Sequence, residues 1–252
     1  MNIFHKILDC LFIRNITVEN MLAQSDLKEF SYLPEKNKNK IRKYLQEGMS
    51  KGLNPQAVTL NLIGRINPQT FKREGGIISL SNQQKQEIKT IHSYLLNFDN
   101  RYFDVEMRDK RFDRSVRKSI RNKIPLAKEK IDKILNSIEN LILRRDVGIV
   151  VHDEVFKAIA KSEYDSILKL INEGEITKDM VTKWWSDSGD EKTRESHKEL
   201  GKRYDKAHAI PFDEPFITES GAKLMYPHDD TLGAPQEEIS GCRCKCQYYI
   251  EF

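Results

Sequence analysis

A long run of helical periodicity in the middle of the chain constrains its fold more than any other feature. From Pro125 onward, apolar side chains recur at steps of three and four residues, which places them on one face of an amphipathic helix. We expect this helix to reach Asn172, with a break near Gly148, and Gly174 is well placed to end it. The apolar positions are Leu126, Ile131, Ile134, Leu135, Ile138, Leu141 and Ile142.

The residues before this helix predict shorter helices joined by turns. One ends near Gly52, and Asn54 then precedes Pro55, an N-cap followed by proline at the first helical position. Ser81 and Gln84 have the spacing of a capping box at the start of a helix that runs to about residue 97. The loop before it contains Gly75-Gly76, which allow close backbone approach, and a short extended segment around residues 77–78.

Beyond Gly174 the sequence becomes richer in Trp, Pro, Gly and Asp, and its apolar segments are short. The segments PFIT and AKLMYP flank Glu219-Ser220-Gly221, which indicates a β-hairpin, and CRCKCQYYIEF alternates like another strand. The sequence therefore predicts an α+β protein, with a mostly helical region over residues 1–174. A small C-terminal α+β module with a β-hairpin and a terminal strand follows over residues 175–252.

Composition limits the classes of protein to which the chain can belong. A formal net charge of +4 is far below that of a dedicated DNA-binding domain. No apolar stretch approaches the roughly 20 residues of a transmembrane helix, and no signal peptide is recognisable. Apolar residues near the start, Ile3, Ile7, Leu11 and Phe12, recur at helical spacing, and we expect them to pack on protein rather than on a membrane surface. The uneven cysteine spacing fits a reducing cytoplasm.

Basic residues concentrate in one stretch of the helical region. Between residues 101 and 145, fourteen basic side chains stand against seven acidic ones. Such a segment can face the phosphates of double-stranded DNA, whereas the alternative is a solvated helix face with acidic partners. The candidate DNA contacts are Arg108, Arg111, Arg114, Arg117, Lys118 and Arg121.

The segment between Trp184 and Cys244 carries an ordered series of motifs. A Trp is followed by Asp-x-x-x-Arg-x-x-His, then by a Pro-Phe and Gly-containing hairpin with a Tyr-Pro turn, and by a closing Cys-Arg-Cys. In this order the segment resembles the phage Mu F-like minor head or head-morphogenesis family. The matching residues are Trp185, Asp190, Arg194, His197, Pro215, Phe216, Gly221, Tyr226, Pro227, Asp229, Cys242, Arg243 and Cys244.

The chain also departs from that pattern. His152, Asp153 and Glu154 stand where the family usually has Arg-Thr-Glu, and His228 replaces the usual glycine of the turn. The Asp-Gly that typically follows the histidine is altered as well. These departures indicate a divergent member rather than a different family.

The resemblance implies a structural virion component and not an enzyme. It implies a minor capsid protein of a tailed bacteriophage that acts at or near the portal vertex in head assembly, and in DNA packaging or delivery. The implied partners are the portal protein, other head proteins and double-stranded DNA, with copies arranged in a ring and no membrane. The implied location is the virion head, assembled in the bacterial cytoplasm.

The cysteines and histidines suggest a metal site as one of two interpretations. In a strand, Cys242, Cys244 and Cys246 would direct their thiols to one face. With His197, and with His208 or His228 as further candidates, they supply the ligands of a structural zinc site. The alternative, which we favour, is that the cysteines fill a small buried core. No other cofactor is indicated.

The Asp-x-x-x-Arg-x-x-His motif likewise has two interpretations. Asp190, Arg194 and His197 would share one face of a helix and form a structural ion-pair network. In the alternative, His197 is a general base oriented by Asp190, and Arg194 holds a phosphate. The chain would then be a metal-dependent enzyme acting on nucleic acid through His197 and the cysteine cluster.

Overall fold

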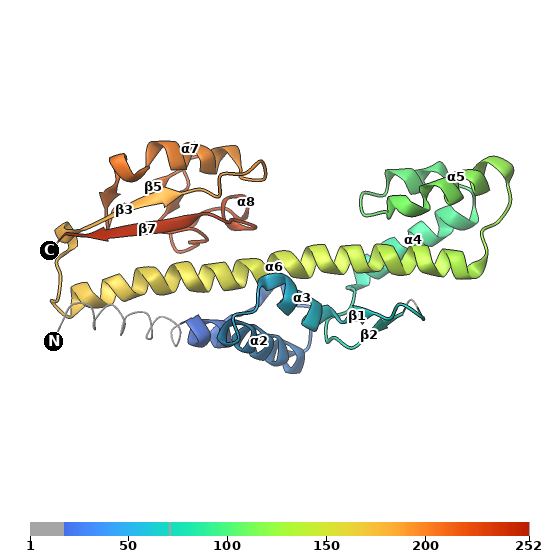
Figure 1. The fold of residues 1–252 in the computed structure, drawn as a ribbon, viewed down its shortest axis with the longest axis horizontal. Coiled ribbons are helices and arrows are strands. Elements are labelled where there is room, and N and C mark those ends of the chain that lie inside the picture. Colours follow the sequence, from blue (N-terminus) through green and yellow to red (C-terminus); the bar gives the residue numbers. More distant parts are fainter. Residues whose placement is uncertain (1–17, 71, 252) are drawn as a thin grey trace. The chain divides into compact units, whose positions relative to one another are not determined.

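The computed structural model describes residues 18–70 and 72–251 of an α+β protein, and the expected helix over Ile3–Phe12 lies outside them. The chain divides into two compact units (Figure 1). We call residues 27–148 the helical unit, and residues 149–251 together with residues 18–26 the mixed unit. The division lies within the long helix, whereas the sequence placed a boundary at Gly174.

The helical unit consists of α-helices, short 3-10 turns and one small strand pair. Strands β1 and β2 pair antiparallel, with Arg65 opposite Glu74. The elements are η1 (Lys28–Phe30), α2 (Glu35–Ser50), α3 (Pro55–Ile63), β1 (Arg65–Ile66), β2 (Arg73–Glu74), α4 (Asn82–Leu96), η2 (Asn100–Asp104), η3 (Lys110–Phe112), α5 (Asp113–Asn122) and the first part of α6 (Lys128–Asn172).

The expected helix caps of this unit are confirmed. The side chain of Asn54 accepts a hydrogen bond of 2.8 Å from the amide of Ala57 at the start of α3. Ser81 and Gln84 form the reciprocal capping box of α4. These bonds satisfy amides that lack partners inside the first turn of each helix.

The loop between α3 and α4 folds differently from the expectation. The extended residues are those of β1 and β2, and not residues 77–78. Gly76 nevertheless allows the close approach of two backbone segments that we expected from a glycine. A Cβ atom at this position would lie 2.4 Å from the carbonyl carbon of Ile63. Each of the two strands is only two residues long, so periodicity could not reveal them.

Helix α6 is continuous through Gly148, so the expected break is absent, and its end at Asn172 is confirmed. Gly174 follows with a φ of +72°, which suits the left-handed conformation that ends helices. The predicted apolar face is only partly buried. Ile131, Ile134, Ile138 and Ile142 are buried, whereas Leu126, Leu135 and Leu141 are half-buried.

The mixed unit places a small sheet between helices. Strand β3 lies in the middle of the three-stranded sheet and pairs antiparallel with β4 and with β7, so that Val181 faces Ile250. The predicted hairpin and final strand are both present as β5–β6 and β7. The elements are the second part of α6, η4 (Lys178–Met180), β3 (Val181–Ser186), α7 (Glu195–Arg203), η5 (Lys206–His208), β4 (Ile210–Pro211), β5 (Phe216–Ile217), β6 (Lys223–Leu224), α8 (Gln236–Ile239) and β7 (Lys245–Ile250).

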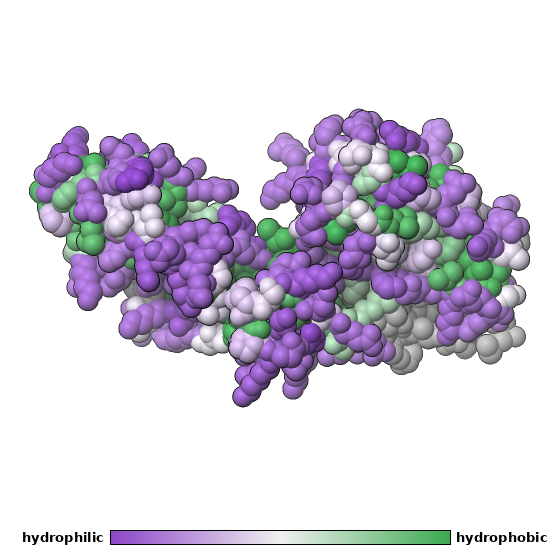
Figure 2. Space-filling view, turned by 180° about the vertical axis from the view of Figure 1, so that it is seen from behind, coloured by the Kyte–Doolittle hydropathy of each residue, from purple (hydrophilic) through white to green (hydrophobic). Residues whose placement is uncertain are grey.

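Apolar side chains from both sides of the sheet form the core of the mixed unit. Trp185 of β3 packs with Leu200 of α7 and Ala160 of α6, as the strands lie between these two helices (Figure 1). The hairpin contributes the fully buried Phe216. Hydrophilic side chains cover most of the face shown in Figure 2. None of the described helices is long and apolar enough to cross a membrane.

Candidate metal centre

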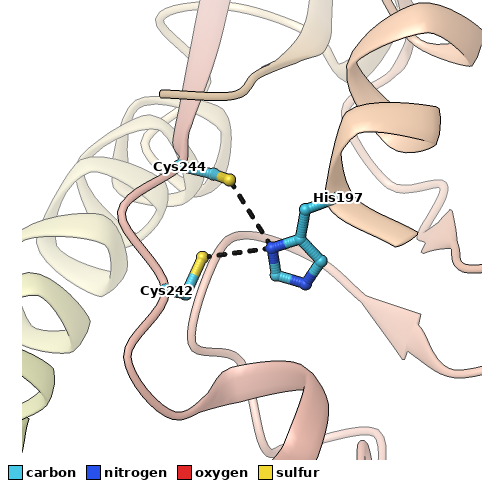
Figure 3. A group of neighbouring side chains, drawn as sticks. All are labelled: His197, Cys242 and Cys244. Atoms are coloured by element: carbon cyan, nitrogen blue, oxygen red, sulfur yellow. Dashed lines mark hydrogen bonds between the residues drawn. The ribbon is translucent and has the colours of Figure 1, made fainter. Parts of the chain in front are cut away.

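Three potential metal ligands meet inside the mixed unit. Helix α7 supplies His197, and the segment that leads into β7 supplies Cys242 and Cys244. The Nδ1 atom of His197 lies 3.4 Å from the Sγ atom of Cys242 and 3.5 Å from that of Cys244 (Figure 3). The three residues are 2%, 2% and 4% exposed, so solvent barely reaches them.

The spacing of these atoms matches that of ligands around one ion. Zinc lies about 2.3 Å from thiolate sulfur and about 2.0 Å from imidazole nitrogen, so tetrahedral N and S ligands are about 3.5 Å apart. The distances between His197 and the two cysteines fall at this value. The group is therefore a candidate metal site, whose three ligand atoms lie within 4.8 Å of one another.

The two thiols are electrostatically unequal. A hydrogen bond between them lowers the pKa of Cys244 and raises that of Cys242, and burial adds to the rise at Cys242. Contacts with His197 also lower the pKa of Cys244. A thiolate is the form of cysteine that binds metal, so the contacts that lower the pKa of Cys244 favour metal binding at this thiol.

The other side of the His197 ring faces a carboxylate that the sequence did not single out. Nε2 of His197 lies 3.4 Å from Oε2 of Glu238, which is itself 8% exposed. Glu238 also accepts hydrogen bonds from the hydroxyls of Ser196 and Ser220. Metal-binding histidines commonly donate a hydrogen bond from the second nitrogen to a carboxylate. Among the described residues, Nε2 of His197 makes no hydrogen bond, and Glu238 is its nearby carboxylate.

Cys246 does not belong to this group, which corrects the expectation of three thiols around one ion. Strand β7 begins only at Lys245, so the regular alternation of a strand does not extend back to Cys242 and Cys244. Burial raises the pKa of the Cys246 thiol to about 12, which keeps it neutral. The cysteine fills the core, as the simpler interpretation predicted for all three.

The two other histidines considered as ligands lie elsewhere. His208 is exposed, and its Nδ1 atom lies 2.8 Å from a carboxylate oxygen of Asp205. His228 is buried and belongs to a different cluster, with its Nε2 atom 2.8 Å from the carbonyl oxygen of Cys242. Among the described residues, the group around His197 therefore has three potential ligands, which are His197, Cys242 and Cys244.

The predicted network of Asp190, Arg194 and His197 along one helix face does not form. Helix α7 begins at Glu195, so Asp190 lies in the preceding turn rather than on the helix. Asp190 instead makes two hydrogen bonds of 2.5 Å with Arg243, and its pKa falls to about 2 as a result. Each motif residue bonds to a segment distant in sequence.

Arg194 fixes the loop that carries the cysteines. Its guanidinium donates hydrogen bonds to the carbonyl oxygens of Glu238 and Ser240. Asp153 of α6 holds the same loop from another side, where it accepts bonds from the Ser240 hydroxyl and the Gly241 amide. The cysteine loop is therefore held by α6 and by the start of α7.

The remaining motif residues build the core and turns of the mixed unit. Trp185 packs edge-on against both His197 and Phe216, with ring centroids 5.2 Å apart in each case. Asp229 is fully buried and accepts hydrogen bonds from the amides of Met225 and Thr231. Tyr226 and Pro227 are buried, Pro215 precedes β5, and Gly221 has a φ of +83° in the hairpin turn.

A buried lysine was not anticipated. Lys183 is fully buried at an inward-facing position of β3, and its ammonium donates a 2.9 Å hydrogen bond to the carbonyl of Met225. The Nζ atom also lies 5.0 Å from the ring centre of Phe216. Burial lowers the pKa of Lys183 to about 8.

The basic stretch of the helical unit separates into paired and unpaired residues. Arg108 pairs with Asp113, and Arg111 with Asp109. The other four candidate DNA contacts are exposed on α5 at spacings of three and four, which places them on one helix face. Among the described residues, no acidic side chain pairs with these four, which are Arg114, Arg117, Lys118 and Arg121.

Compared with known proteins, the chain matches no family model, no curated protein and no solved structure.

Proposed function

We propose that this chain is a structural protein of a tailed-phage head, a minor capsid or head-morphogenesis protein that acts at or near the portal vertex. The proposal rests mainly on one observation: the motif residues of the mixed unit make contacts that hold the fold together. Asp190 and Arg243 join two distant segments, and Arg194 anchors the cysteine loop. Residues with these contacts stabilise a fold, which supports a role in assembly rather than in catalysis.

The metal group supports the same role. His197, Cys242 and Cys244 are at most 4% exposed, and reacting groups of an enzyme need access to substrate. We propose that this group binds zinc, which would fasten α7 to the segment before β7. When bound, zinc supplies a covalent-like link between the two segments, and small modules often depend on such a link for folding.

The basic face of α5 supports contact with DNA during packaging or delivery. Four exposed cations on one face of a helix present positive charge over a distance comparable to a few phosphates of a duplex. Such contacts are independent of base sequence. We propose that this face, Arg114, Arg117, Lys118 and Arg121, meets the DNA that passes the portal.

A pull-down of the full chain with the portal protein of its phage tests the main proposal. The experiment is run at low and high salt, with zinc assayed on the purified sample. We expect co-purification that survives high salt, because the proposed contact is between folded proteins and not through DNA. A variant with Arg114, Arg117, Lys118 and Arg121 changed to alanine should keep portal binding and lose salt-sensitive DNA binding.

A metal-dependent enzyme acting on nucleic acid is the second candidate. One observation favours it: the group has three protein ligands, and catalytic zinc sites keep a fourth position for water or substrate. DNA cleavage that depends on a divalent metal and is abolished in His197→Ala would support this candidate. Such cleavage, together with no portal binding at either salt concentration, would overturn the structural proposal.

A further inference from the structure

A second cluster of potential metal ligands lies on the other side of the cysteine loop. Helix α6 contributes His152 and Asp153, and the turn after β6 contributes His228. Oδ1 of Asp153 lies 3.3 Å from Nδ1 of His152 and 3.8 Å from Nδ1 of His228. Two imidazole nitrogens and a carboxylate oxygen thus converge within 4.8 Å of one another.

The ring of His228 is held in the tautomer that a metal ligand needs. Its Nε2 atom is 2.8 Å from the carbonyl oxygen of Cys242, which can only accept a hydrogen bond, so Nε2 carries the proton. The neutral ring then has its lone pair on Nδ1, the atom that faces Asp153.

The backbone at His228 is unusual for a residue with a side chain. Its φ is +66°, in the left-handed region that is unfavourable for a non-glycine residue. Glycine would avoid this cost, so contacts of the imidazole must offset it. The hydrogen bond to Cys242 is one such contact, and a bound ion would be another.

The positions of His152 and Asp153 suit a site that solvent can reach. The ring of His152 stacks on Phe156 with centroids 4.2 Å apart, which restricts its orientation. The side chains of His152 and Asp153 are 20% and 21% exposed, so a water molecule can complete the coordination. Tetrahedral nitrogen and oxygen ligands of zinc lie about 3.4 Å apart, close to the distances found here.

We propose that His152, Asp153 and His228 form a second metal site that binds Zn²⁺ through two imidazoles and one carboxylate. Imidazole and carboxylate ligands suit this borderline divalent ion, and the open position would be occupied by water. The ion would join α6 to the turn after β6. Asp153 and His228 also bond to the loop at residues 240–242, so the site supports the segment that presents Cys242 to His197. The inference goes beyond head assembly and does not depend on it.

Titration of the reduced, metal-free full chain with Zn²⁺, and then with Co²⁺ as a spectroscopic probe, tests this site. The Co²⁺ ion bound by thiolates absorbs strongly through sulfur charge transfer, whereas Co²⁺ bound by nitrogen and oxygen shows only weak visible bands. We expect His152→Ala and His228→Gly each to remove one equivalent of bound metal. His152→Ala should leave the sulfur band unchanged, whereas His228→Gly also removes the hydrogen bond to the Cys242 carbonyl and is judged by the metal count alone. The double variant Cys242→Ser, Cys244→Ser should show the converse.

The variants and controls are chosen so that misfolding does not obscure the result. Glycine suits the backbone of residue 228, and alanine suits the helix at residue 152. Unchanged circular dichroism and tryptophan fluorescence would show that each variant folds, and His208→Ala serves as the control with an exposed histidine removed. If folded His152→Ala and His228→Gly bind as much metal as the wild type, the second site does not exist. Portal binding is measured separately, so its absence would leave this result intact.

Discussion

Replacement of Lys183 by methionine tests how the buried ammonium group affects the stability of the mixed unit. In the unfolded chain this lysine has a pKa near 10.5, whereas in the folded protein it falls to about 8 because the side chain is buried. Between these values the unfolded state binds more protons, so the free energy of unfolding rises with pH. The methionine variant lacks this dependence.

The size of the effect follows from the pKa difference. Each pH unit within the window contributes about 1.4 kcal/mol, so wild type should gain about 2 kcal/mol relative to Lys183→Met between pH 8 and 9.5. Cys246 acts in the opposite direction above pH 9, because its folded pKa is raised to about 12. That contribution is present in both proteins, but Lys183 lowers the pKa of Cys246, so the comparison is made mainly below pH 9, where Cys246 contributes little.

Urea unfolding followed by tryptophan fluorescence measures this difference. The two tryptophans of the chain, Trp184 and Trp185, both lie in β3, so their fluorescence reports on the mixed unit. A reducing agent keeps the cysteines reduced, and a chelator keeps the protein free of metal, at every pH of the series. Lys223→Met, at an exposed position of β6, is the control and should show no pH-dependent difference. The reasoning would be refuted if the difference in the free energy of unfolding between wild type and Lys183→Met stayed constant from pH 7.5 to 9.5.

Three further substitutions test the core and the helical unit. Ser81→Ala removes the capping box of α4 and should lower the free energy of unfolding by about 1 kcal/mol, measured by circular dichroism in urea. Asp109→Asn should cost about 1 to 2 kcal/mol at pH 7, because Arg111 lowers the pKa of the carboxyl to about 2 but is largely exposed and screened. This loss should disappear as the pH falls from 4 to 2, where Asp109 becomes protonated. Phe216→Ala leaves a cavity in the core and should cost about 3 to 5 kcal/mol, seen as an earlier urea transition in tryptophan fluorescence.

Each of these expectations has a result that would contradict it. Equal urea midpoints for Ser81→Ala and wild type would mean that the capping box contributes little in this context. A deficit of Asp109→Asn that persists at pH 2 would assign the loss to packing rather than to charge. A cost below about 1 kcal/mol for Phe216→Ala would show that the core relaxes around the missing ring.

The sequence predicted those parts of the fold that depend on neighbouring residues. The caps at Asn54 and Ser81, the end of α6 and the hairpin around Gly221 all follow from local chemistry, and the structure confirms them. The break at Gly148 was wrong because one glycine costs only about 1 kcal/mol, which helix packing readily offsets.

The candidate site depends on contacts that no local pattern encodes. Asp190 bonds to Arg243 rather than to Arg194, since the helix that would have aligned it with Arg194 begins five residues later. Cys246 lies two residues after Cys244 in the sequence, but β7 begins only at Lys245, and of these two cysteines only Cys244 lies beside His197. These differences depend on where α7 and β7 begin, and element boundaries are the least reliable part of a sequence-based prediction.

The pairing of β3 with β7 also affects how the mixed unit folds. Val181 pairs with Ile250, so the chain between the two strands must close a long loop before any of the hydrogen bonds of this pairing form. In the helical unit, elements that follow one another in the chain pack together, such as α2 with α3 and β1 with β2, and this unit should fold earlier and faster. A metal ion that brings His197 to Cys242 would shorten the loop that remains to be closed. Refolding of the mixed unit should then be the slow kinetic phase, and zinc should accelerate it.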